Sequence, residues 1–293
     1  MLAPEHAFVM TINYDKLMAL SAVDVPCDYD DRDSLLYAVG VGFGADPLDA
    51  KELPYVVETM GRHTVPTMAT TLIRTDILEN CGWNYAQVLH GEQKLDLYRP
   101  LPMSAQLLTT SRVASVHDRG AGRGAVIRVS TEARLKRDDT ALFTVESTLI
   151  ARGDGGFGGP GGKLEAPHKL PAREPDLSCD IAIRADQALL YRLCGDRNPL
   201  HSDPAVARSA GFDAPILHGL CTYGIACRAI LMTICDYDFT LINGFRARFS
   251  APVFPGDVLT TDMWQDRNVI SFRCHVKSRQ SVVLNNGKCL LAS

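Results

Sequence analysis

The feature that most restricts the fold of this chain is an apolar run at residues 216–235. It is 20 residues long and contains one residue of the Asp, Glu, Lys and Arg class, Arg228. Two structures accommodate such a run: a membrane span, which needs about 20 apolar residues, or a helix buried on all sides within a globular protein. Because His218, Thr222, Tyr223 and two glycines interrupt the run, we favour the buried helix. Other elements of the chain must then enclose it.

The pattern around this run occurs twice. An apolar helical stretch begins at Pro66 and a second one begins at Pro215, 149 residues later; a Pro-rich turn at Pro100 is likewise followed by one at Pro252. Alternating strands are expected after each turn, over residues 107–152 and 258–291. The similar offsets predict a duplicated unit of helix followed by antiparallel strands. Within the second unit, Asn286-Gly287 is the dipeptide preferred in a tight hairpin turn, and we expect a turn there.

The two units are separated by a segment rich in glycine and proline. Residues 153–162 contain seven glycines, and four prolines lie at positions 160, 167, 171 and 175. Residues 153–158 match the pattern G-x-G-x-x-G, but a dinucleotide site also needs a helix that opens on the last glycine, and more glycine and proline follow instead. We therefore divide the chain into an N-terminal unit (1–152), a linker (153–175) and a C-terminal unit (176–293).

A polar motif lies just before the second apolar helix, at residues 191–201, and reads Tyr-Arg-Leu-Cys-Gly-Asp-Arg-Asn-Pro-Leu-His. Asn198 is a favourable N-cap and Pro199 a favourable first helical residue. We expect His201 in the first turn of a helix that begins at Pro199, and Asp196 in the loop before it. A carboxylate and an imidazole can then face one small volume and move protons as a general acid and base.

This motif resembles the hydratase 2 signature of the MaoC-like (R)-specific enoyl-CoA hydratases. Further blocks are similar to the hydratase unit of the peroxisomal multifunctional enzyme type 2, in the same order: residues 53–58, 65–67, 90–93, 98–102, 247–249 and 252–256. The resemblance implies an α+β double hot-dog fold, in which each of two units wraps a long helix in an antiparallel sheet. It also implies hydration of a trans-2-enoyl-CoA to a (3R)-3-hydroxyacyl-CoA, as in β-oxidation of fatty acids or sterol side chains, with no cofactor and no metal.

The resemblance assigns roles to individual residues. Hydration needs one group to take a proton from water and another to deliver a proton to Cα, roles that suit Asp196 and His201. The N–H of Gly219 is the candidate donor to the thioester oxygen, and loss of such a donor typically costs roughly 3–4 kcal/mol. Asn198 both caps the turn and holds the water or Asp196. The implied contacts to acyl-CoA are His90, Gly91, Arg119, Asp196, Arg197, Asn198, Pro199, Leu200, His201, Gly219 and Phe249. The N-terminal unit has no such dyad and is expected to be a binding half.

Other interpretations of these residues stay open. Asp196 alone could be a simple cap, Arg119 a solvated hairpin residue where relatives usually have lysine, and Phe249 a core residue. We expect His218 to be structural or to support a catalytic neighbour. At the level of function, the alternatives are an acyl-thioester dehydratase working in the reverse direction and a non-catalytic acyl-CoA-binding module. The intact pair of Asp196 and His201 favours catalysis over the binding module.

Charge and cysteine content limit the partners. A net charge of −4 and a pI near 6.1 leave no broad basic field for nucleic acid or an anionic membrane. Nine cysteines without a C-x-x-C pair favour reduced thiols in a reducing compartment. We expect a cytoplasmic protein, with the peroxisome as the alternative although the final Leu-Ala-Ser is not a convincing peroxisomal signal. The expected partners are the acyl-CoA substrate, a second copy in a homodimer and a 3-hydroxyacyl-CoA dehydrogenase.

Overall fold

In the computed structural model, which describes residues 12–73, 76–79, 81–84, 87–162 and 164–292, strands from both units join in one sheet. The sheet has ten strands in the described part of the chain, and every neighbouring pair is antiparallel. In sheet order the strands are β1 (Ser21–Tyr29), β3 (Ala105–Asp118), β4 (Ala125–Leu135), β5 (Ala141–Ala151), β2 (Val88–Leu97), β7 (Ile242–Phe249), β10 (Ser281–Leu291), β9 (Val269–Val276), β8 (Val258–Asp266) and β6 (Leu177–Ala182).

The two sets of five strands meet at the centre of the sheet. Strand β2 pairs with β7, where Gln93 faces Ala247 and Leu95 faces Phe245. All strands on the β2 side precede residue 153, and all strands on the β7 side follow residue 176. Strands β2 and β3 alternate buried and more exposed residues, as expected of an antiparallel sheet with one face on the core, whereas residues 259–264 of β8 are all buried. Our division into units at these residues stays a prediction that this arrangement supports.

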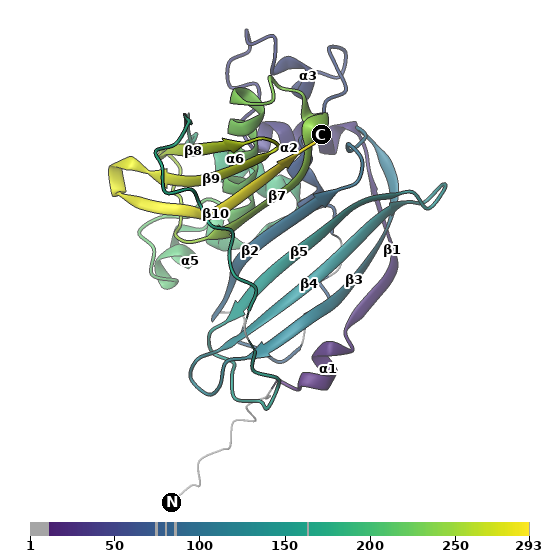
Figure 1. The fold of residues 1–293 in the computed structure, drawn as a ribbon, viewed down its shortest axis with the longest axis vertical. Helices are drawn as coiled ribbons and strands as arrows, with labels where there is room; N and C mark the ends of the chain where they lie inside the picture. Colours follow the sequence, from purple (N-terminus) through teal and green to yellow (C-terminus); the bar gives the residue numbers. More distant parts are fainter. Residues whose placement is uncertain (1–11, 74–75, 80, 85–86, 163, 293) are drawn as a thin grey trace, which may run out of the picture.

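The long apolar run forms the buried helix α6 (Gly219–Thr233). Its residues 221–231 are all buried, and it packs against β6, β7 and β8 and against the short helix η1 (Pro66–Thr71). Figure 1 shows α6 behind the C-terminal strands. The helix ends at Thr233, and beyond it Asp236 and Tyr237 adopt positive φ angles of 48° and 64°, outside the right-handed helical region. The expectation of a helix enclosed by the sheet is confirmed.

No helix in the described residues is both long and apolar enough to cross a membrane.

The N-terminal unit differs from expectation at Pro66. The predicted long helix is the six-residue 3-10 helix η1. Thr70 and Thr71 donate their hydroxyls to the carbonyls of Thr67 and Met68, at 2.8 and 2.9 Å. Such local bonds and β-branched side chains both weaken a continued α-helix. The apolar pattern at Pro66 therefore belongs to a buried segment that does not form an α-helix. The two units are less alike than the sequence offsets indicated.

The remaining helices are short and lie at the ends of the strands. Helix α2 begins with a reciprocal capping box, in which Asp30 and Asp33 each accept a backbone N–H from the other. The others have between three and six residues. Helix α2 spans Asp31–Gly40, and the other described helices are α1 (Tyr14–Met18), α3 (Leu53–Val56), α4 (Gln187–Tyr191), η3 (Arg192–Cys194), η4 (Pro199–His201), α5 (Pro204–Ser209), η5 (Phe239–Leu241) and η6 (Lys277–Arg279).

The hairpin turn predicted at Asn286-Gly287 is wrong. Both residues lie inside β10, where the pairing register with β7 shifts between Asn285 and Lys288. Asn286 has a positive φ of 54°, and a Cβ on Gly287 would lie 2.6 Å from the ring of Phe272. The dipeptide thus supplies the special backbone geometry of a β-bulge, which has the same preference for these residues as a tight turn.

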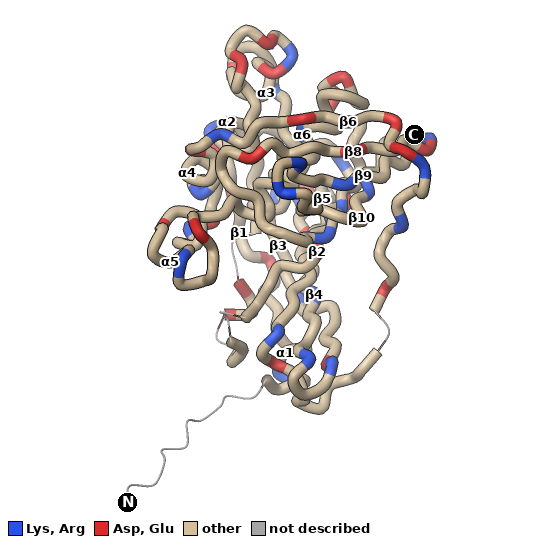
Figure 2. Tube along the Cα trace, turned by 90° about the vertical axis from the view of Figure 1, so that its left-hand side faces the viewer, with Lys and Arg blue, Asp and Glu red and all other residues tan. Residues whose placement is uncertain are grey.

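The linker runs along the face of the sheet opposite α6 (Figure 1). Glu165 lies 3.9 Å from Arg128 of β4 and 3.8 Å from Arg246 of β7, so it bridges both units. The imidazole of His168 hydrogen bonds Ser271 of β9 at 2.8 Å. Basic and acidic residues are interspersed along the chain in Figure 2, in agreement with the absence of a broad basic field expected from the net charge.

An ion pair joins the N-terminal unit to the middle of α6. Arg228 donates from Nε and Nη2 to Oε1 of Glu52, at 2.8 and 2.5 Å, and both side chains are almost fully buried. Glu52 also accepts the N–H of Gly44 at 2.8 Å. The single charged residue of the apolar run is therefore neutralised inside the core by a carboxylate from the other unit, which is what permits its burial.

We predict that Glu52→Ala lowers the free energy of unfolding by about 3–5 kcal/mol, because it leaves the Arg228 charge buried without a partner. Urea unfolding followed by circular dichroism measures this change. Lys51→Ala is the matched control, since Lys51 pairs with Asp236 at 2.6 Å on the surface and its loss should leave the midpoint unchanged. Equal effects of the two substitutions would contradict the importance of the buried pair.

Candidate active site

The loop from α4 to η4 holds Asp196 through local hydrogen bonds. Oδ1 of Asp196 accepts the backbone N–H of Asn198 at 3.0 Å, and Oδ1 of Asn198 accepts the N–H of Leu200 at 3.0 Å. Pro199 then opens η4, which ends at His201. The predicted cap at Asn198 and the placement of His201 in the first turn are both confirmed. The side chain of Asp196 is exposed, whereas His201 is 8% exposed.

The surroundings of His201 fix which of its nitrogens can act as a base. Nδ1 lies 2.9 Å from the backbone carbonyl of Ile216. A carbonyl only accepts, so Nδ1 carries the proton and Nε2 carries a lone pair. Burial lowers the pKa of His201 below 6.5, against the opposing effects of Ile216 and Asp196. At neutral pH the ring is therefore uncharged and ready to accept a proton at Nε2.

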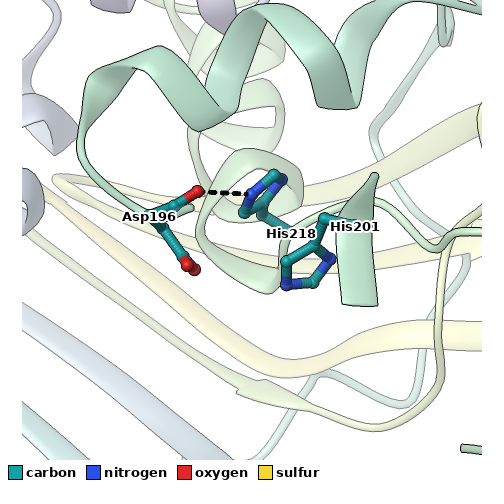
Figure 3. A group of neighbouring side chains, drawn as sticks. All are labelled: Asp196, His201 and His218. Atoms are coloured by element: carbon teal, nitrogen blue, oxygen red, sulfur yellow. Dashed lines mark hydrogen bonds between the residues drawn. The ribbon is translucent and has the colours of Figure 1, made fainter. Parts of the chain in front are cut away.

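His218 links Asp196 to His201. Its Nε2 donates to the backbone carbonyl of Asp196 at 3.1 Å, and its ring stacks on that of His201 with centroids 3.8 Å apart and planes 26° apart. Figure 3 shows this bond and the two neighbouring rings. Each of the three residues has a polar atom within 4.8 Å of those of the other two. The carboxylate of Asp196 and the imidazole of His201 can therefore act on one bound molecule.

The three residues do not fit a single metal ion. A ligating imidazole holds the metal in the plane of its ring at about 2.0–2.1 Å, and two rings stacked with nearly parallel planes cannot place one ion in both planes at that distance. Nε2 of His218 is already committed to the carbonyl of Asp196. The arrangement suits proton transfer rather than metal binding.

Two cavities flank the pair of Asp196 and His201. A cavity of about 400 Å³ is lined by Thr70, Thr71, Ile73, Tyr191, Cys194, Gly195, Asp196 and Leu220. A second, of about 270 Å³ and with a largely apolar lining, is formed by Leu89, His90, His201, Phe212, Ile216, Leu217, Gly219, Thr222, Phe249, Ser250, Ala251, Pro252, Val253, Val283 and Leu284. Because both units contribute to each lining, the site depends on their joining.

Several expected ligand contacts meet in the second cavity. His90, His201, Gly219 and Phe249 line it, and the rings of His90 and Phe249 lie 4.8 Å apart. Nε2 of His90 is buried with no hydrogen-bond partner among the described residues, and burial lowers the pKa of His90 to about 4. His90 therefore presents a neutral ring. Its role as a ligand contact stays a prediction.

Gly219 occupies the first position of α6, directly after the N-cap His218. The first N–H groups of a helix have no intrahelical partner and lie at the positive end of the helix dipole. A Cβ on Gly219 would lie 3.2 Å from the ring of Phe249, so glycine allows this close approach. The position is suitable for stabilising a developing negative charge on an oxygen.

The other expected contacts lie outside both cavity linings in the described structure. Gly91 is buried in a β-bulge of β2, where a Cβ would lie 2.8 Å from Ile150, so packing explains the glycine. Arg119 is exposed in the turn between β3 and β4. Arg197, Asn198, Pro199 and Leu200 form the exposed to partly buried stretch between Asp196 and His201. Their contacts to a ligand stay predictions.

Sequence reasoning missed much of the cavity lining. Thr70, Thr71 and Ile73 come from the N-terminal unit and Phe212 from a loop after α5. None of these residues has a chemical signature in the sequence, because apolar and hydroxyl side chains serve equally in cores. Tyr191 opens the polar motif, and that position was the sequence signal for it; its hydroxyl is buried with no hydrogen-bond partner among the described residues.

Known protein families match both units. Residues 27–153 match the MFE-2 hydratase 2 N-terminal domain, and residues 167–286 match the MaoC like domain. An enoyl-CoA hydratase of Mycobacterium tuberculosis is 37% identical, covering 95% of this chain and 98% of its own. The peroxisomal enoyl-CoA hydratase 2 of Arabidopsis thaliana is 35% identical, with 93% of each chain covered. The peroxisomal hydratase-dehydrogenase-epimerase of Saccharomyces cerevisiae is 32% identical over 90% of this chain and 30% of its own length.

Solved structures confirm the fold. The crystal structure of a MaoC-like dehydratase from Phytophthora capsici superposes with a TM-score of 0.85 at 31% identity, covering 96% of this chain and 98% of that one. A Mycobacterium tuberculosis protein described as having a double hot-dog fold superposes with a TM-score of 0.56 at 14% identity, covering 96% and 98%, and shares the fold alone. The expected α+β double hot-dog class is confirmed.

The buried imidazoles predict how stability depends on pH. Burial lowers the pKa of His90 and of His218 to about 4 and lowers that of His201 as well, whereas each titrates near 6.5 when unfolded. Between pH 6.5 and about 4 the unfolded chain binds more protons than the folded chain, so the free energy of unfolding falls as the pH falls through this window. The stability contributed by the three neutral histidines is fully present above pH 6.5. The loss is on the order of a few kcal/mol.

Histidine ring proton shifts in NMR spectra, recorded as a function of pH, measure the three pKa values. Urea unfolding at pH 7 and pH 5 measures the change in the free energy of unfolding. Titration of the three rings at or above pH 6.5 would contradict the assignment.

Proposed function

The chain belongs to the MaoC-like hydratase 2 family, and on that basis we propose that it adds water to trans-2-enoyl-CoA thioesters to give (3R)-3-hydroxyacyl-CoA. The observation that carries the proposal is the pair of Asp196 and His201, with polar atoms within 4.8 Å, between two cavities. Nε2 of His201 is left as a proton acceptor by the bond from Nδ1 to Ile216. Two groups that transfer protons are what the hydration of a conjugated double bond requires.

The addition proceeds through an enolate. Nε2 of His201 takes a proton from water as the water oxygen bonds to Cβ, and the π electrons move toward the thioester oxygen. The N–H of Gly219 at the start of α6 stabilises the negative charge on that oxygen. The proton passes from the imidazolium through the neighbouring carboxylate of Asp196 to Cα. One water is thereby divided between Cβ, which gains the hydroxyl, and Cα, which gains the hydrogen.

The same groups catalyse the reverse elimination, since each step is reversible. A 3-hydroxyacyl-thioester dehydratase of Mycobacterium tuberculosis is 39% identical to this chain, which keeps the dehydratase direction as the second candidate. The non-catalytic binding module is less favoured, because the base, the carboxylate and the helix terminus are all in place. We further propose β-oxidation as the setting, with the product passing to a 3-hydroxyacyl-CoA dehydrogenase.

The assembly and compartment belong to the same proposal. We infer a homodimer that binds acyl-CoA without a metal or other cofactor, as the resemblance of the sequence implies. The plant and yeast relatives are named as peroxisomal enzymes, which supports the peroxisome as the alternative to the cytoplasm for this chain.

We predict that Asp196→Asn and His201→Gln each lower kcat by about 100-fold or more, because each removes one proton-transfer group. Loss of absorbance by the conjugated thioester measures hydration, and circular dichroism checks that each variant folds. His168→Gln is a matched control, because His168 lies in the linker and hydrogen bonds Ser271 of β9 rather than a site residue. Near wild-type turnover by either folded dyad variant would reject the assignment.

The stereochemistry tests the family assignment separately. Asp196 and His201 come from one short loop and are expected to reach one face of the double bond. We predict that trans-2-decenoyl-CoA gives a product oxidised by an R-specific 3-hydroxyacyl-CoA dehydrogenase and not by an S-specific one. An S product would overturn the proposal, and the absence of product from short, long, branched and sterol-type substrates would favour the binding module.

A further inference from the structure

We propose that His218 is a positioning residue that sets the relative placement of the three groups used in hydration. This inference rests on the proposed function and deepens it. His218 donates to the backbone of Asp196, stacks on His201 and directly precedes Gly219. One side chain therefore connects the carboxylate loop, the imidazole base and the helix terminus.

The loop that carries Asp196 needs such a connection. Gly195, Asp196 and Arg197 are exposed, and Gly195 has a positive φ of 130° with open space around it. The carboxylate of Asp196 bonds only one residue of its own loop, Asn198, among its described partners. The bond from Nε2 of His218 is what joins this exposed loop to the buried helix α6.

The side chain of His218 is not used to cap its own helix. The backbone carbonyl of His218 accepts from the N–H and the hydroxyl of Thr222, at 3.1 and 3.3 Å, but its side chain makes no capping bond. Ser, Thr, Asp and Asn are the residues that cap a helix through the side chain. Histidine at this position is therefore explained by what its ring contacts outside α6.

Packing alone also fails to explain the imidazole. His218 is 1% exposed and its ring lies 5.0 Å from that of Tyr191 and 3.8 Å from that of His201. Because Nε2 carries the proton, Nδ1 carries a lone pair, and this atom is buried with no hydrogen-bond partner in the part of the chain that the structure describes. Such an unsatisfied group is costly. A phenylalanine could fill the same space without it, so the bond from Nε2 to Asp196 is the feature that requires histidine.

Three substitutions of His218 distinguish its hydrogen bond to Asp196 from its ring stacking on His201. His218→Phe keeps an aromatic ring against His201 and removes the donor to Asp196. His218→Gln carries an amide N–H at nearly the position of Nε2 and removes the ring. His218→Asn has its amide near the position of Nδ1, so it removes both contacts. His63→Phe is the matched control, because His63 is likewise packed between aromatic rings, those of Tyr55 and Phe239, and has an unpartnered Nδ1.

We expect kcat to fall by about 10- to 100-fold in His218→Phe and His218→Asn, while KM changes by less than about threefold, since misplacement of a reacting group of about 1 Å can cost that much. His218→Gln should restore most of the turnover lost in His218→Asn. His63→Phe should leave kcat unchanged. Wild-type kcat in folded His218→Phe, or equal losses in the Gln and Asn variants, would overturn the inference.

Spectra of uniformly ¹⁵N-labelled protein, which report both the imidazole nitrogens and the backbone amides, provide a readout that does not depend on turnover. We expect the wild type to show His201 protonated at Nδ1 and His218 at Nε2, and the amide signals of Asp196 and Asn198 to move in His218→Phe but not in His63→Phe. An inactive wild type with these signals would reject the proposed function and retain the positioning role. Unmoved amide signals in an active enzyme would reject the positioning role alone.

Discussion

The enclosure of α6 is the constraint on which the rest of the structure depends. A helix with 11 consecutive buried residues has no face for solvent, so it needs a sheet on one side and further elements on the others. Its one charge, on Arg228, is matched by Glu52 from the N-terminal unit. Enclosing this helix therefore requires both units, and it also fixes the helix start, Gly219, beside the paired side chains of Asp196 and His201.

The sequence allowed prediction where a local rule was sufficient. The cap at Asn198, the turn that places His201 and the buried helix all follow from short-range preferences or from the absence of charge. The same reasoning gave the wrong result at Pro66 and at Asn286-Gly287. Apolar content does not distinguish an α-helix from another buried segment, and an Asn-Gly pair suits a bulge as well as a turn.

The site itself was only partly accessible to such rules. Its acid and base lie in one motif, but the bond from His218 to Asp196 spans 22 residues and the cavities are lined by both units. Those contacts depend on how α6 packs against the sheet. The site also contrasts an exposed carboxylate with a buried imidazole, and burial keeps the free imidazole uncharged, so that its Nε2 can accept a proton.

The pairing of β2 with β7 at the centre of the sheet has a consequence for solubility. Two separate five-stranded sheets would present four edges with unpaired backbone groups, whereas the joined sheet presents two, at β1 and β6. Both edge strands have features that disfavour pairing with a strand of another chain. Strand β1 contains Pro26 and an irregularity between Ala22 and Val25, and β6 is six residues long and carries Asp180. Joining the two units thus removes the edges at β2 and β7, which pair with each other in the middle of the sheet.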